Sequence, residues 1–578
     1  MLAGLGERLN SASTLRGTES VRARPFFADR ATGRAAGLAA AVASAVVAPM
    51  LWRGNASGHD FEFHIRSWME VAQQWHAGIF LPRWAAGANY GFGEPRFIFY
   101  PPASWLLGAT LGGALPWRVV PGVFVWLTLV IAGLSMFALA RERLPRDVAM
   151  LAGILYAANP YHLVIVYYRS DFAELLASAL LPLPVLFALR LKDGGWRSVA
   201  PLAAAFAAIW LSNAPTGVVA SYSLALIVIV VSIAERSTGI LAPGILVRGS
   251  AGIAAGFGLA AFYLVPAAWE QGWVRITEVL SLNLRPEQNF LFTHSNDPEF
   301  MLFNWKVSGV ALGVIGVTAL AAFAARRRRQ EFPAAFWAMA ALGGAAVALM
   351  FPASSPAWRW LPKLRFMQFP WRWLLALDVA FTFFFALATA RTKWKRAWWL
   401  AMGLALAALG STLVHDAWWD SDDVPDNLAA IQSGAGYEGT DEYQPRGCDR
   451  ADLPADAPRA SIEDERPAGL RLHVEEWGPE SRAVALDTPR AVTLALKLVN
   501  YPAWRVEVNG QPAAVESRPQ TAQMLLALPP GSSRVTAHFM RTPDRTIGGV
   551  ISAATALLLS GLLLTRRRPA LGASSGSG

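Results

Sequence analysis

Apolar segments of membrane-spanning length recur along the chain and restrict its fold more than any other feature. Examples run from about Val119 to Ala140 and from about Ile547 to Leu564. Each approaches the roughly 20 residues that a helix needs to cross a bilayer. Of the 578 residues, 54% are hydrophobic and only 16% are charged, which is too apolar for an average soluble protein. The sequence therefore predicts a polytopic helical membrane protein.

Basic residues lie mostly in the short turns between these apolar segments. The formal net charge is +10, but a concentration of Lys and Arg in short turns is typical of the cytoplasmic side of a membrane protein. We therefore exclude nucleic acid as a partner and expect the lipid bilayer instead. The single cysteine, Cys448, excludes a disulfide framework within one chain.

The alternation of basic turns predicts the topology when it is counted backwards from the end. The last span stops at Arg566-Arg567-Arg568, so the C-terminus is predicted in the cytoplasm. The same count places the N-terminus there as well. The predicted regions are a cytoplasmic tail (1–33), a transmembrane domain (34–414) with its first outer loop at 53–118, an outer domain (415–546), a last transmembrane helix (547–565) and a cytoplasmic tail (566–578).

One apolar piece, from about Phe97 to Leu115, does not fit this alternation. The span before it must end outside and the span after it must begin outside, so the piece cannot cross fully. It is short and contains Pro101-Pro102, which predicts a re-entrant or surface-lying helix. The alternative is a true span with a local exception to the charge rule. The prediction is thus about twelve spans and one half-span.

Between about Leu470 and Met540 the hydrophobic periodicity changes from helical to alternating. Four stretches alternate in the manner of β-strands, at 482–486, 492–496, 504–508 and 534–539. Asn509-Gly510 predicts a two-residue hairpin turn, because both residues tolerate positive φ. The predicted fold class is therefore a mainly α, polytopic membrane bundle with an extracytoplasmic β-sandwich near the C-terminus.

An ionisable cluster after the first span contains the first candidate site residues. His59, Asp60 and His64 lie in the run Gly58-His59-Asp60-Phe61-Glu62-Phe63-His64, and on a helix His64 lies one turn from Asp60. Such groups are costly to desolvate beside a bilayer, which favours a function for them. Asp60 is either a tuned base or only a helix N-cap. These residues lack a specific metal-ligand spacing, so no cofactor is predicted and a divalent metal has only weak support.

Other outer loops supply further candidates. They are Arg83 from the first loop, Arg169, Asp171 and Glu174 from or just after the second loop (about 159–173), and Gln368 and Arg372 from the fifth. The arginines suit an anionic phosphate because guanidinium forks match phosphate oxygens. Arg169 with Glu174 is alternatively a structural pair. The absence of a phosphate-binding loop, dinucleotide fingerprint or nucleophile elbow in a convincing context argues against ATP hydrolysis.

Together these motifs resemble a known family. Gly58 to His64, Gly78 to Trp84, Phe99-Tyr100-Pro101-Pro102 and Gln368 to Arg372 are similar to bacterial membrane proteins described as 6-pyruvoyl-tetrahydropterin synthase-related. The architecture also resembles YfhO-like proteins and, more distantly, type C glycosyltransferases. By this resemblance Asp60 matches the acidic position of the first outer loop, and Asp171 or Glu174 that of the second. The second loop departs from the pattern because it lacks a clear Asp-x-Asp pair.

The resemblance, with the outer-face acids and arginines, predicts an inverting sugar transfer at the outer face of a bacterial inner membrane. The donor would be a polyprenyl-phosphate-linked sugar and the acceptor a cell-envelope glycan or protein. Asp60 would take the acceptor proton, and Arg372 with Arg83 or Arg169 would hold the leaving phosphate. The predicted site comprises His64, Asp171 and Glu174 beside Asp60, and His59 and Gln368 beside the arginines. The alternatives are a translocator or assembly factor for lipid-linked glycans and an inactive transferase-like scaffold.

Overall fold

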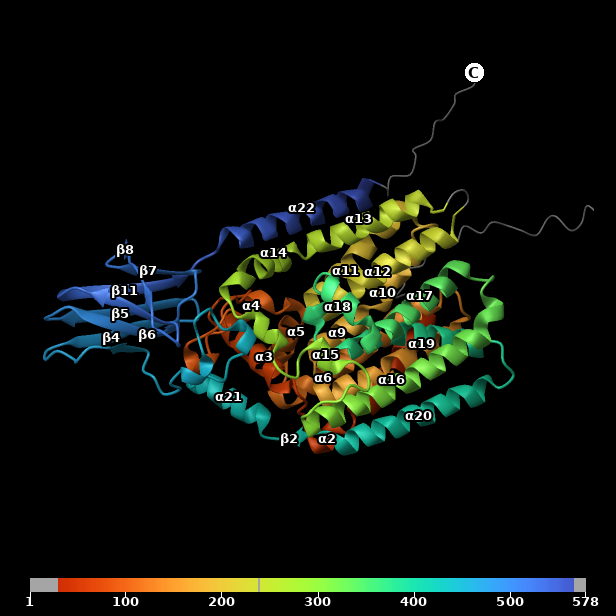
Figure 1. Ribbon diagram of the computed structural model, residues 1–578, viewed down its shortest axis with the longest axis horizontal. Coiled ribbons are helices and arrows are strands. Elements are labelled where there is room, and N and C mark those ends of the chain that lie inside the picture. The colour runs from red at the N-terminus through yellow and green to blue at the C-terminus, as the bar shows by residue number, and fades with distance from the viewer. Residues whose placement is uncertain (1–29, 237–239, 566–578) are drawn as a thin grey trace, which may run out of the picture.

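A bundle of long helices forms one end of the molecule and a β domain forms the other (Figure 1). The computed structural model describes residues 30–236 and 240–565. Most of the predicted tail 1–33, and all of the predicted tail 566–578, lie outside the described residues. The helical bundle and the antiparallel sheets near the C-terminus confirm the predicted fold class.

The bundle is built from helices along the whole chain. Its longer helices are α1 (Arg30–Val47), α6 (Val120–Ala140), α7 (Arg146–Ala157), α9 (Phe172–Leu180), α10 (Pro182–Leu189), α11 (Val199–Ser212), α12 (Ala214–Ala234), α13 (Pro243–Leu259), α14 (Ala261–Glu270), α16 (Pro298–Ala325), α17 (Pro333–Leu349), α19 (Leu374–Thr389), α20 (Lys395–Asp416) and α22 (Pro543–Thr565). Short helices are α2 (Met50–Arg53), α8 (Pro160–Val164), α15 (Pro286–Asn289) and α18 (Ser355–Trp360).

Nine segments of the described chain are long and apolar enough to cross a bilayer, and two bent helix pairs raise the number to eleven. One pair joins α13 to the segment Ala261–Trp273 at 70°, and the other joins α17 to Pro352–Trp360 at 93°. α11 has only 14 residues and falls below this length. The predicted number of about twelve spans is reached only if α11 crosses as well.

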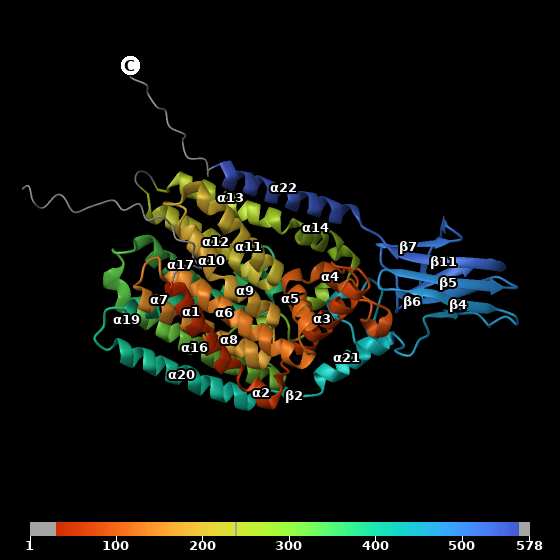
Figure 2. The same ribbon diagram turned by 180° about the vertical axis from the view of Figure 1, so that it is seen from behind.

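Helices differ strongly in how much of their surface the rest of the bundle covers. Nearly all of α19 is buried, whereas α20 and α22 leave most of their apolar side chains exposed. Exposed examples on α20 are Trp398, Leu400 and Leu404. An extended apolar surface on a helix indicates contact with another apolar phase, here lipid. Figure 2 shows α20 and α22 at opposite sides of the bundle.

The basic turns gather at the end of the bundle that lies away from the β domain (Figure 1). Ion pairs join some of them across the bundle. Lys395 pairs with Asp147, and Arg391 Nη1 lies 2.9 Å from Glu331 Oε1. The common position of these turns agrees with the alternation on which the predicted topology depends.

The predicted second outer loop is mostly helical, so that prediction was wrong. α8 starts at Pro160, with Asn159 as an N-cap that accepts a hydrogen bond from the backbone nitrogen of His162 at 2.8 Å. The π-helical turn η4 (Ile165–Arg169) follows directly. Asn-Pro is typical of a turn, but Asn at the cap and Pro at the first helical position also start helices. The continued helix carries Arg169 to its end.

Residues 97–115 form short helices packed on the bundle. α4 (Arg96–Phe99) is followed by α5 (Pro102–Ala114), which lies against α3 (Phe61–His76) and α6. Gly108 permits the close approach, because a Cβ there would lie 2.1 Å from the Trp68 indole. With 13 residues, α5 is too short for an ordinary span. Its re-entrant position in the membrane stays a prediction.

The β domain consists of two antiparallel sheets. One has the order β3-β6-β10-β9 and the other β4-β5-β11-β7-β8. The strands are β3 (Ala460–Ile462), β4 (Arg471–Trp477), β5 (Ser481–Thr488), β6 (Val492–Val499), β7 (Trp504–Val508), β8 (Gln511–Pro512), β9 (Glu516–Ser517), β10 (Gln523–Leu528) and β11 (Gly531–Phe539). Buried side chains of both sheets form one core, as in a sandwich. Asn509 and Gly510 have φ of 50° and 76° between paired strands, which confirms the predicted hairpin.

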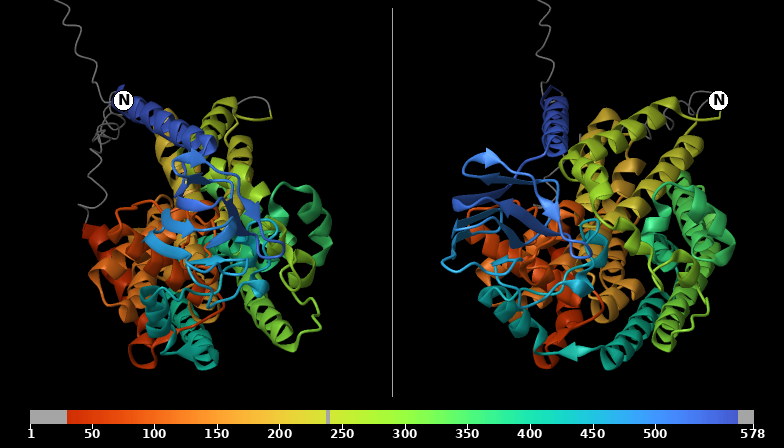
Figure 3. Two further views of the ribbon diagram at one scale, coloured as in Figure 1. Left: turned by 90° about the vertical axis from the view of Figure 1, so that its left-hand side faces the viewer. Right: turned by 60° about the vertical axis from the view of Figure 1, so that its left-hand side comes forward.

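The β domain is attached to the bundle by buried contacts from distant parts of the chain. Trp84 lies against Trp504 and Phe539, with ring centroids 5.6 Å and 5.5 Å away. The hydroxyl of Tyr501, which follows β6, donates a hydrogen bond to Glu270 of α14, and Glu270 also accepts hydrogen bonds from Arg545 Nε and Nη2 of α22 at 2.8 Å and 2.9 Å. Figure 3 views this end of the molecule, with the sheets in front of the helices. A further two-stranded pairing, β1 (Asn55–Ala56) with β2 (Trp419–Asp420), precedes α21 (Asp423–Ser433), which packs on α3.

Candidate active site

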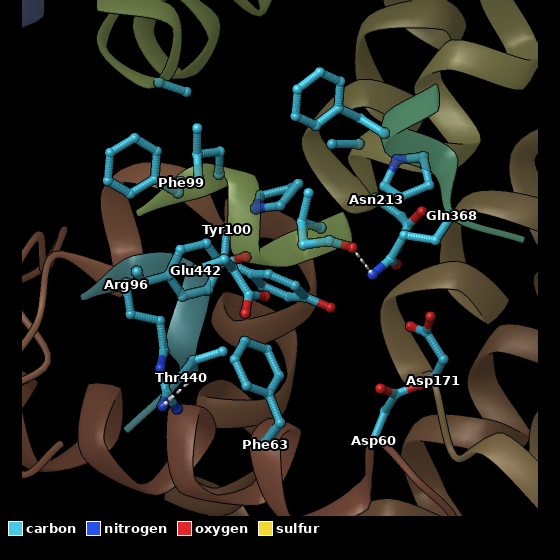
Figure 4. A pocket seen from close by; sticks show the side chains of 18 of the residues that line it. Asp60, Phe63, Arg96, Phe99, Tyr100, Asp171, Asn213, Gln368, Thr440 and Glu442 are labelled. Carbon is cyan, nitrogen blue, oxygen red and sulfur yellow. Dashed lines mark hydrogen bonds between the residues drawn. The ribbon is translucent and has the colours of Figure 1, made fainter. Parts of the chain in front are cut away.

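A cavity of about 660 Å³ lies between the bundle and the segments that lead to the β domain. Part of its lining is charged or ionisable, and part is apolar. The first part comprises His59, Asp60, Glu62, Arg66, Arg96, Asp171, Lys363, Arg372, Glu438 and Glu442. The apolar part includes Trp210, Val218, Tyr263, Leu264, Ile276, Val279 and Phe366, from α11, α12, α14, η7 (Ile276–Leu280) and η10 (Leu364–Met367). Figure 4 shows side chains from both parts.

Gly58 allows the start of α3 to lie directly against η4. A Cβ at Gly58 would lie 2.4 Å from the carbonyl oxygen of Tyr168, so a larger residue would separate the two segments. Gly58 N donates to Ser170 Oγ at 3.0 Å, and Asp60 N donates to the Arg169 carbonyl at 2.8 Å. These backbone contacts place Asp60 beside Arg169.

Asp60 occupies the N-cap position of α3, but its side chain makes no capping hydrogen bond. Its Oδ2 instead accepts a hydrogen bond from Arg169 Nη2 at 2.7 Å. The side chain is 36% exposed and lines the cavity. The N-cap alternative therefore does not describe this carboxylate, which belongs to a charged cluster.

The turn η4 positions the second group of charged residues. Ser170 N donates to the Ile165 carbonyl at 2.7 Å, five residues back, and Ser170 has a left-handed φ of 52°. Asp171 then caps α9, because its Oδ1 accepts from Glu174 N at 2.9 Å. Single π-helical turns are frequent at functional sites. Here the turn brings Arg169, Asp171 and Glu174 together.

Arg169 and Arg372 are both held by carboxylates. Arg169 Nη1 and Arg372 Nε each donate to Glu174 Oε2 at 2.8 Å. Asp171 Oδ2 lies 3.2 Å from Arg169 Nη2 and 3.5 Å from Arg372 Nη2. With Asp60, the cluster contains three carboxylates and two guanidiniums, so its ionised form has an excess of negative charge. Both guanidiniums are therefore paired with carboxylates, and neither is unpaired and free to bind a phosphate.

His64 contacts Asp171 but is not part of the cavity lining. Its buried Nε2 is 3.4 Å from Asp171 Oδ1. Burial acts to raise the pKa of Asp171, but the contact with His64 and the charges of Arg169 and Arg372 outweigh it and hold the pKa well below its ordinary value. Asp171 is therefore ionised at neutral pH and links His64 to the arginines.

Gln368 lines the cavity from a backbone conformation that is rare for its residue type. Its φ is 63°, in the left-handed region that favours glycine. The side-chain Nε2 donates to the Val279 carbonyl at 2.8 Å, and Oε1 lies 3.4 Å from Arg372 Nη1. The side chain thus connects η7 to the charged cluster.

His59 lines the cavity next to Asp60. Its ring lies edge-on to Phe303, with centroids 5.1 Å apart. Burial lowers the pKa of His59, the charge of Asp60 opposes the shift, and Arg169 adds to it. His59 is therefore a neutral hydrogen-bonding group at pH 7.

Arg83 does not line this cavity. The next residue, Trp84, is buried against Trp504 of the β domain, and this contact carries Arg83 towards Arg545 and Glu270. Burial lowers the pKa of Arg83 to about 10, the charge of Arg545 adds to the shift, and Glu270 opposes it. The structure therefore separates Arg83 from the other predicted site residues.

No group of three or more His, Cys, Asp or Glu side chains within residues 30–236 and 240–565 has an arrangement that could hold a metal ion. His59, Asp60 and His64 do not converge on one point. His64 contacts Asp171, whereas Asp60 contacts Arg169.

Residues 97–421 match the family described as 6-pyruvoyl-tetrahydropterin synthase related domain, membrane protein. This match covers more than half of the 578-residue chain. The chain belongs to this family. The family region contains the predicted site residues Arg169, Asp171, Glu174, Gln368 and Arg372, whereas Asp60 and His64 precede it.

Two solved structures of glycosyltransferases share a partial likeness with this family member. The oligosaccharyltransferase of Archaeoglobus fulgidus has a TM-score of 0.42 at 14% identity, over 73% of this chain and 61% of that one. The arabinofuranosyltransferase AftD from Mycobacteria has a TM-score of 0.40 at 20% identity, over 67% of this chain and 26% of that one. This chain thus spans less than two thirds of either structure. Among curated proteins, none matches the chain in sequence.

Several cavity residues of this family member were not among the predicted site residues, and two of these have no ion-pair partner among the described residues. Lys363 precedes η10, and Glu442 lies in η12 (Asp441–Tyr443). They are the charged cavity side chains for which the described part of the chain provides no ion-pair partner. In the sequence, Glu442 belongs to the polar run from Tyr437 to Pro445. The acidic residues of this run look solvated as long as its contact with α3 and α4 is unknown. Lys363 looks like an interfacial anchor.

Proposed function

We propose that this protein is a membrane glycosyltransferase that uses a polyprenyl-phosphate-linked sugar as its donor. The observation that carries the proposal is the single cavity that combines a charged lining with an apolar one. A lipid-linked sugar has the same two parts, a polar head group and a long apolar tail. A binding site for it therefore needs polar groups at one end and an apolar path at the other.

The apolar lining supports a position for the lipid tail along α14. Leu264 and Ala268 line both the cavity and a second, apolar groove of about 440 Å³ that includes Phe257, Val265 and Trp269. Trp269 is largely exposed. We propose that the first isoprene units lie along these residues and that the sugar lies on the charged side.

The charged cluster supports a role in stabilising the transition state. Glycosyl transfer develops positive charge on the sugar ring, and the cluster of Asp60, Asp171 and Glu174 has more carboxylates than guanidiniums. Asp60 would contact the sugar, because its side chain is the most exposed of the three. His64, Asp171 and Glu174 would hold Arg169 and Arg372 in position around it.

The leaving phosphate needs positive charge. Arg372 lines the cavity but is paired with Glu174, so we propose that it contributes together with Lys363. The Lys363 ammonium lies 3.3 Å from Gln271 Oε1 and 5.0 Å from the Phe366 ring centroid, at the border of the apolar lining. The phosphate joins the lipid to the sugar and would lie at the same border. Gln368 and His59 would donate hydrogen bonds to the head group.

The proposed membrane orientation follows from the basic turns at the end opposite the β domain. Lys and Arg in short turns favour the cytoplasm, so the cavity would open at the outer face of a bacterial inner membrane and both termini would be cytoplasmic. The acceptor would be a cell-envelope glycan or protein. Direct displacement by an acceptor hydroxyl would invert the anomeric centre.

The proposal is tested with purified protein in lipid nanodiscs. Polyprenyl-phosphate-linked sugars are added with isolated envelope glycans, and mass spectrometry follows free polyprenyl phosphate and glycosylated acceptor. We expect transfer by the natural chain and a loss of about 100-fold for Asp60→Asn, the size typical for removing one transition-state contact.

The matched control is Asp147→Asn, which makes the same chemical change at an aspartate that pairs with Lys395 far from the cavity. It should transfer at the natural rate. Absence of transfer from every lipid-linked sugar tested, or an equal rate for Asp60→Asn, would contradict the proposal.

One observation favours a translocator as the second candidate. Asp378 is buried within α19 and has no ion-pair partner among the described residues, and a buried carboxylate in a span is often part of a transport path. Flipping of a fluorescent lipid-linked glycan across proteoliposomes, abolished by Asp378→Asn, would support this candidate. Flipping that persists in Asp378→Asn would remove the observation behind it.

A further inference from the structure

Glu442 reaches the cavity from a segment that leads to the β domain. Its helix, η12, lies between α21 and β3, almost 400 residues after Asp60 in the chain. In the view of Figure 4, Glu442 lies with Arg96 and Thr440 on one side of the cavity, and Asp60 lies with Asp171 on the other. The cavity therefore has carboxylates on two sides.

The segment around Glu442 is fixed on both flanks. Thr440 N donates to Glu94 Oε2 at 2.9 Å before it, and Gln444 Nε2 donates to Asn89 Oδ1 at 2.7 Å after it. Tyr443 stacks on Phe99 with centroids 5.9 Å apart and an angle of 8° between the rings. These contacts hold η12 against the segment that contains Asn89, Glu94 and Phe99, so Glu442 has a defined position.

Glu442 differs from Asp60 in its partners. Asp60 accepts a hydrogen bond from Arg169 at 2.7 Å, and a proton placed on Asp60 would weaken an ion pair with a buried guanidinium. The Glu442 carboxylate has no ion pair or side-chain hydrogen bond within the described residues. Protonation of Glu442 therefore breaks no ion pair.

The surroundings of Glu442 also adjust its acidity. Burial raises its pKa to about 7, and the nearby charges of Glu94 and Asp441 add to the shift, while a hydrogen bond from its own backbone N–H and the charge of Arg96 oppose it. A general base is most effective when its pKa lies near the working pH. An ordinary glutamate, with a pKa near 4.3, would be a weaker base.

We propose that Glu442, and not Asp60, is the general base that activates the acceptor. This inference rests on the proposed sugar transfer. The Glu442 carboxylate takes the proton of the acceptor hydroxyl while the hydroxyl oxygen forms a bond to the anomeric carbon. The bond from that carbon to the phosphate oxygen breaks, and its electron pair leaves with the polyprenyl phosphate. Asp60 keeps Arg169 in place and faces the positive charge of the sugar.

The test compares Glu442→Gln with Glu442→Asp and with the control Glu463→Gln. Glu463 pairs with Arg518 in the β domain, away from the cavity. Transfer to the acceptor should fall about 100-fold or more in Glu442→Gln, as expected for loss of a general base. Glu442→Asp should recover part of the rate and Glu463→Gln should keep all of it. Donor binding, measured by native mass spectrometry, should stay unchanged in all three variants.

Azide separates the role of base from a merely structural role. As an anion it needs no deprotonation, so it should restore donor turnover in Glu442→Gln and yield a glycosyl azide of inverted configuration. It should not restore Asp60→Asn. If Glu442→Gln transfers at the natural rate, or binds donor normally and is not rescued by azide, the inference is overturned. Absence of turnover in the natural chain would instead refute the proposed function.

Discussion

Two buried clusters in this protein both contain carboxylates and arginines, but they differ in the number of each and in whether they lie beside a cavity. Around Glu174, three carboxylates meet two arginines beside a cavity. Around Glu270, one carboxylate accepts hydrogen bonds from Nε and Nη2 of Arg545 and from the hydroxyls of Tyr501 and Thr542. The second cluster has a direct hydrogen-bonding partner for its carboxylate and its guanidinium and does not line the cavity, and because Tyr501 joins it to the β domain, we assign it to holding that domain. The first has excess charge next to open space, and we assign it to binding and chemistry.

The largest expected effect tests the cluster around Glu270. Glu270→Gln should lower the free energy of unfolding by about 3–5 kcal/mol, because it leaves the buried Arg545 guanidinium without its counter-charge. Thermal unfolding in detergent would measure the loss. Adding Arg545→Met should recover part of the stability, since an apolar pair leaves no buried charge.

The folded fraction of Glu270→Gln should transfer sugar at the natural rate. A loss of turnover per folded molecule would mean that this cluster also takes part in function, and the distinction between the two clusters would fail.

The cluster around Glu174 should respond in the opposite way, with a loss of turnover and no loss of stability. Asp60→Asn should keep its melting temperature, because the side chain is one-third exposed and Arg169 retains Asp171 and Glu174. Turnover should nevertheless fall about 100-fold. Differential scanning fluorimetry beside the transfer assay separates the two quantities. A large drop in melting temperature with unchanged turnover would make Asp60 a structural residue.

The pH dependence of Glu442 gives a third, intermediate effect. If Glu442 is the base, the transfer rate should rise up to about tenfold per pH unit below its pKa and level off above it, where the pKa is about 7. Glu442→Gln should lose this rise. An unchanged profile in the variant would assign the titration to another group.

The same carboxyl should also affect stability. Because its pKa is raised on folding, the folded state holds the proton between the ordinary pKa of about 4.3 and about 7. Stability should therefore fall as pH rises through this window. Glu442→Gln should unfold with a smaller dependence on pH, whether or not the protein is catalytically active.

The smallest expected effect lies in the β domain, away from both clusters. Gly510 has a φ of 76° in the hairpin turn, so Gly510→Ala should destabilise the domain by about 1 kcal/mol without changing turnover. Ser533→Ala in β11 is a control without a backbone constraint. Equal melting temperatures for Gly510→Ala and the natural chain would show that the turn tolerates a side chain.

Much of the architecture could be predicted because its causes are local. Apolar length marks most spans, and alternation with Asn509-Gly510 marks the β domain. The failure at 159–173 has a local cause too, since Asn159-Pro160 can either end a helix or cap the next one. The short α11 shows that length alone does not settle how many segments cross.

The site was predicted in part, for reasons that can be traced to particular residues. Asp60, Asp171 and Arg372 are charged groups at span ends, so topology alone gathers them near one face. Arg83 fits the same rule, yet Trp84 carries it to the β domain. Predicting Glu442 as a site residue would have required knowledge of a contact between segments more than 300 residues apart, such as that of Thr440 with Glu94. No local pattern encodes such a contact.

The π-helical turn at Ile165–Arg169 has a consequence for how the site can change. One extra residue in a helical turn changes the direction in which all later side chains point, because in an ordinary helix one residue corresponds to a rotation of about 100°. Deleting a single residue such as Val166 would turn Arg169 away from Asp60 without altering any charged side chain. The cluster thus depends on the number of residues in this turn as well as on their identity.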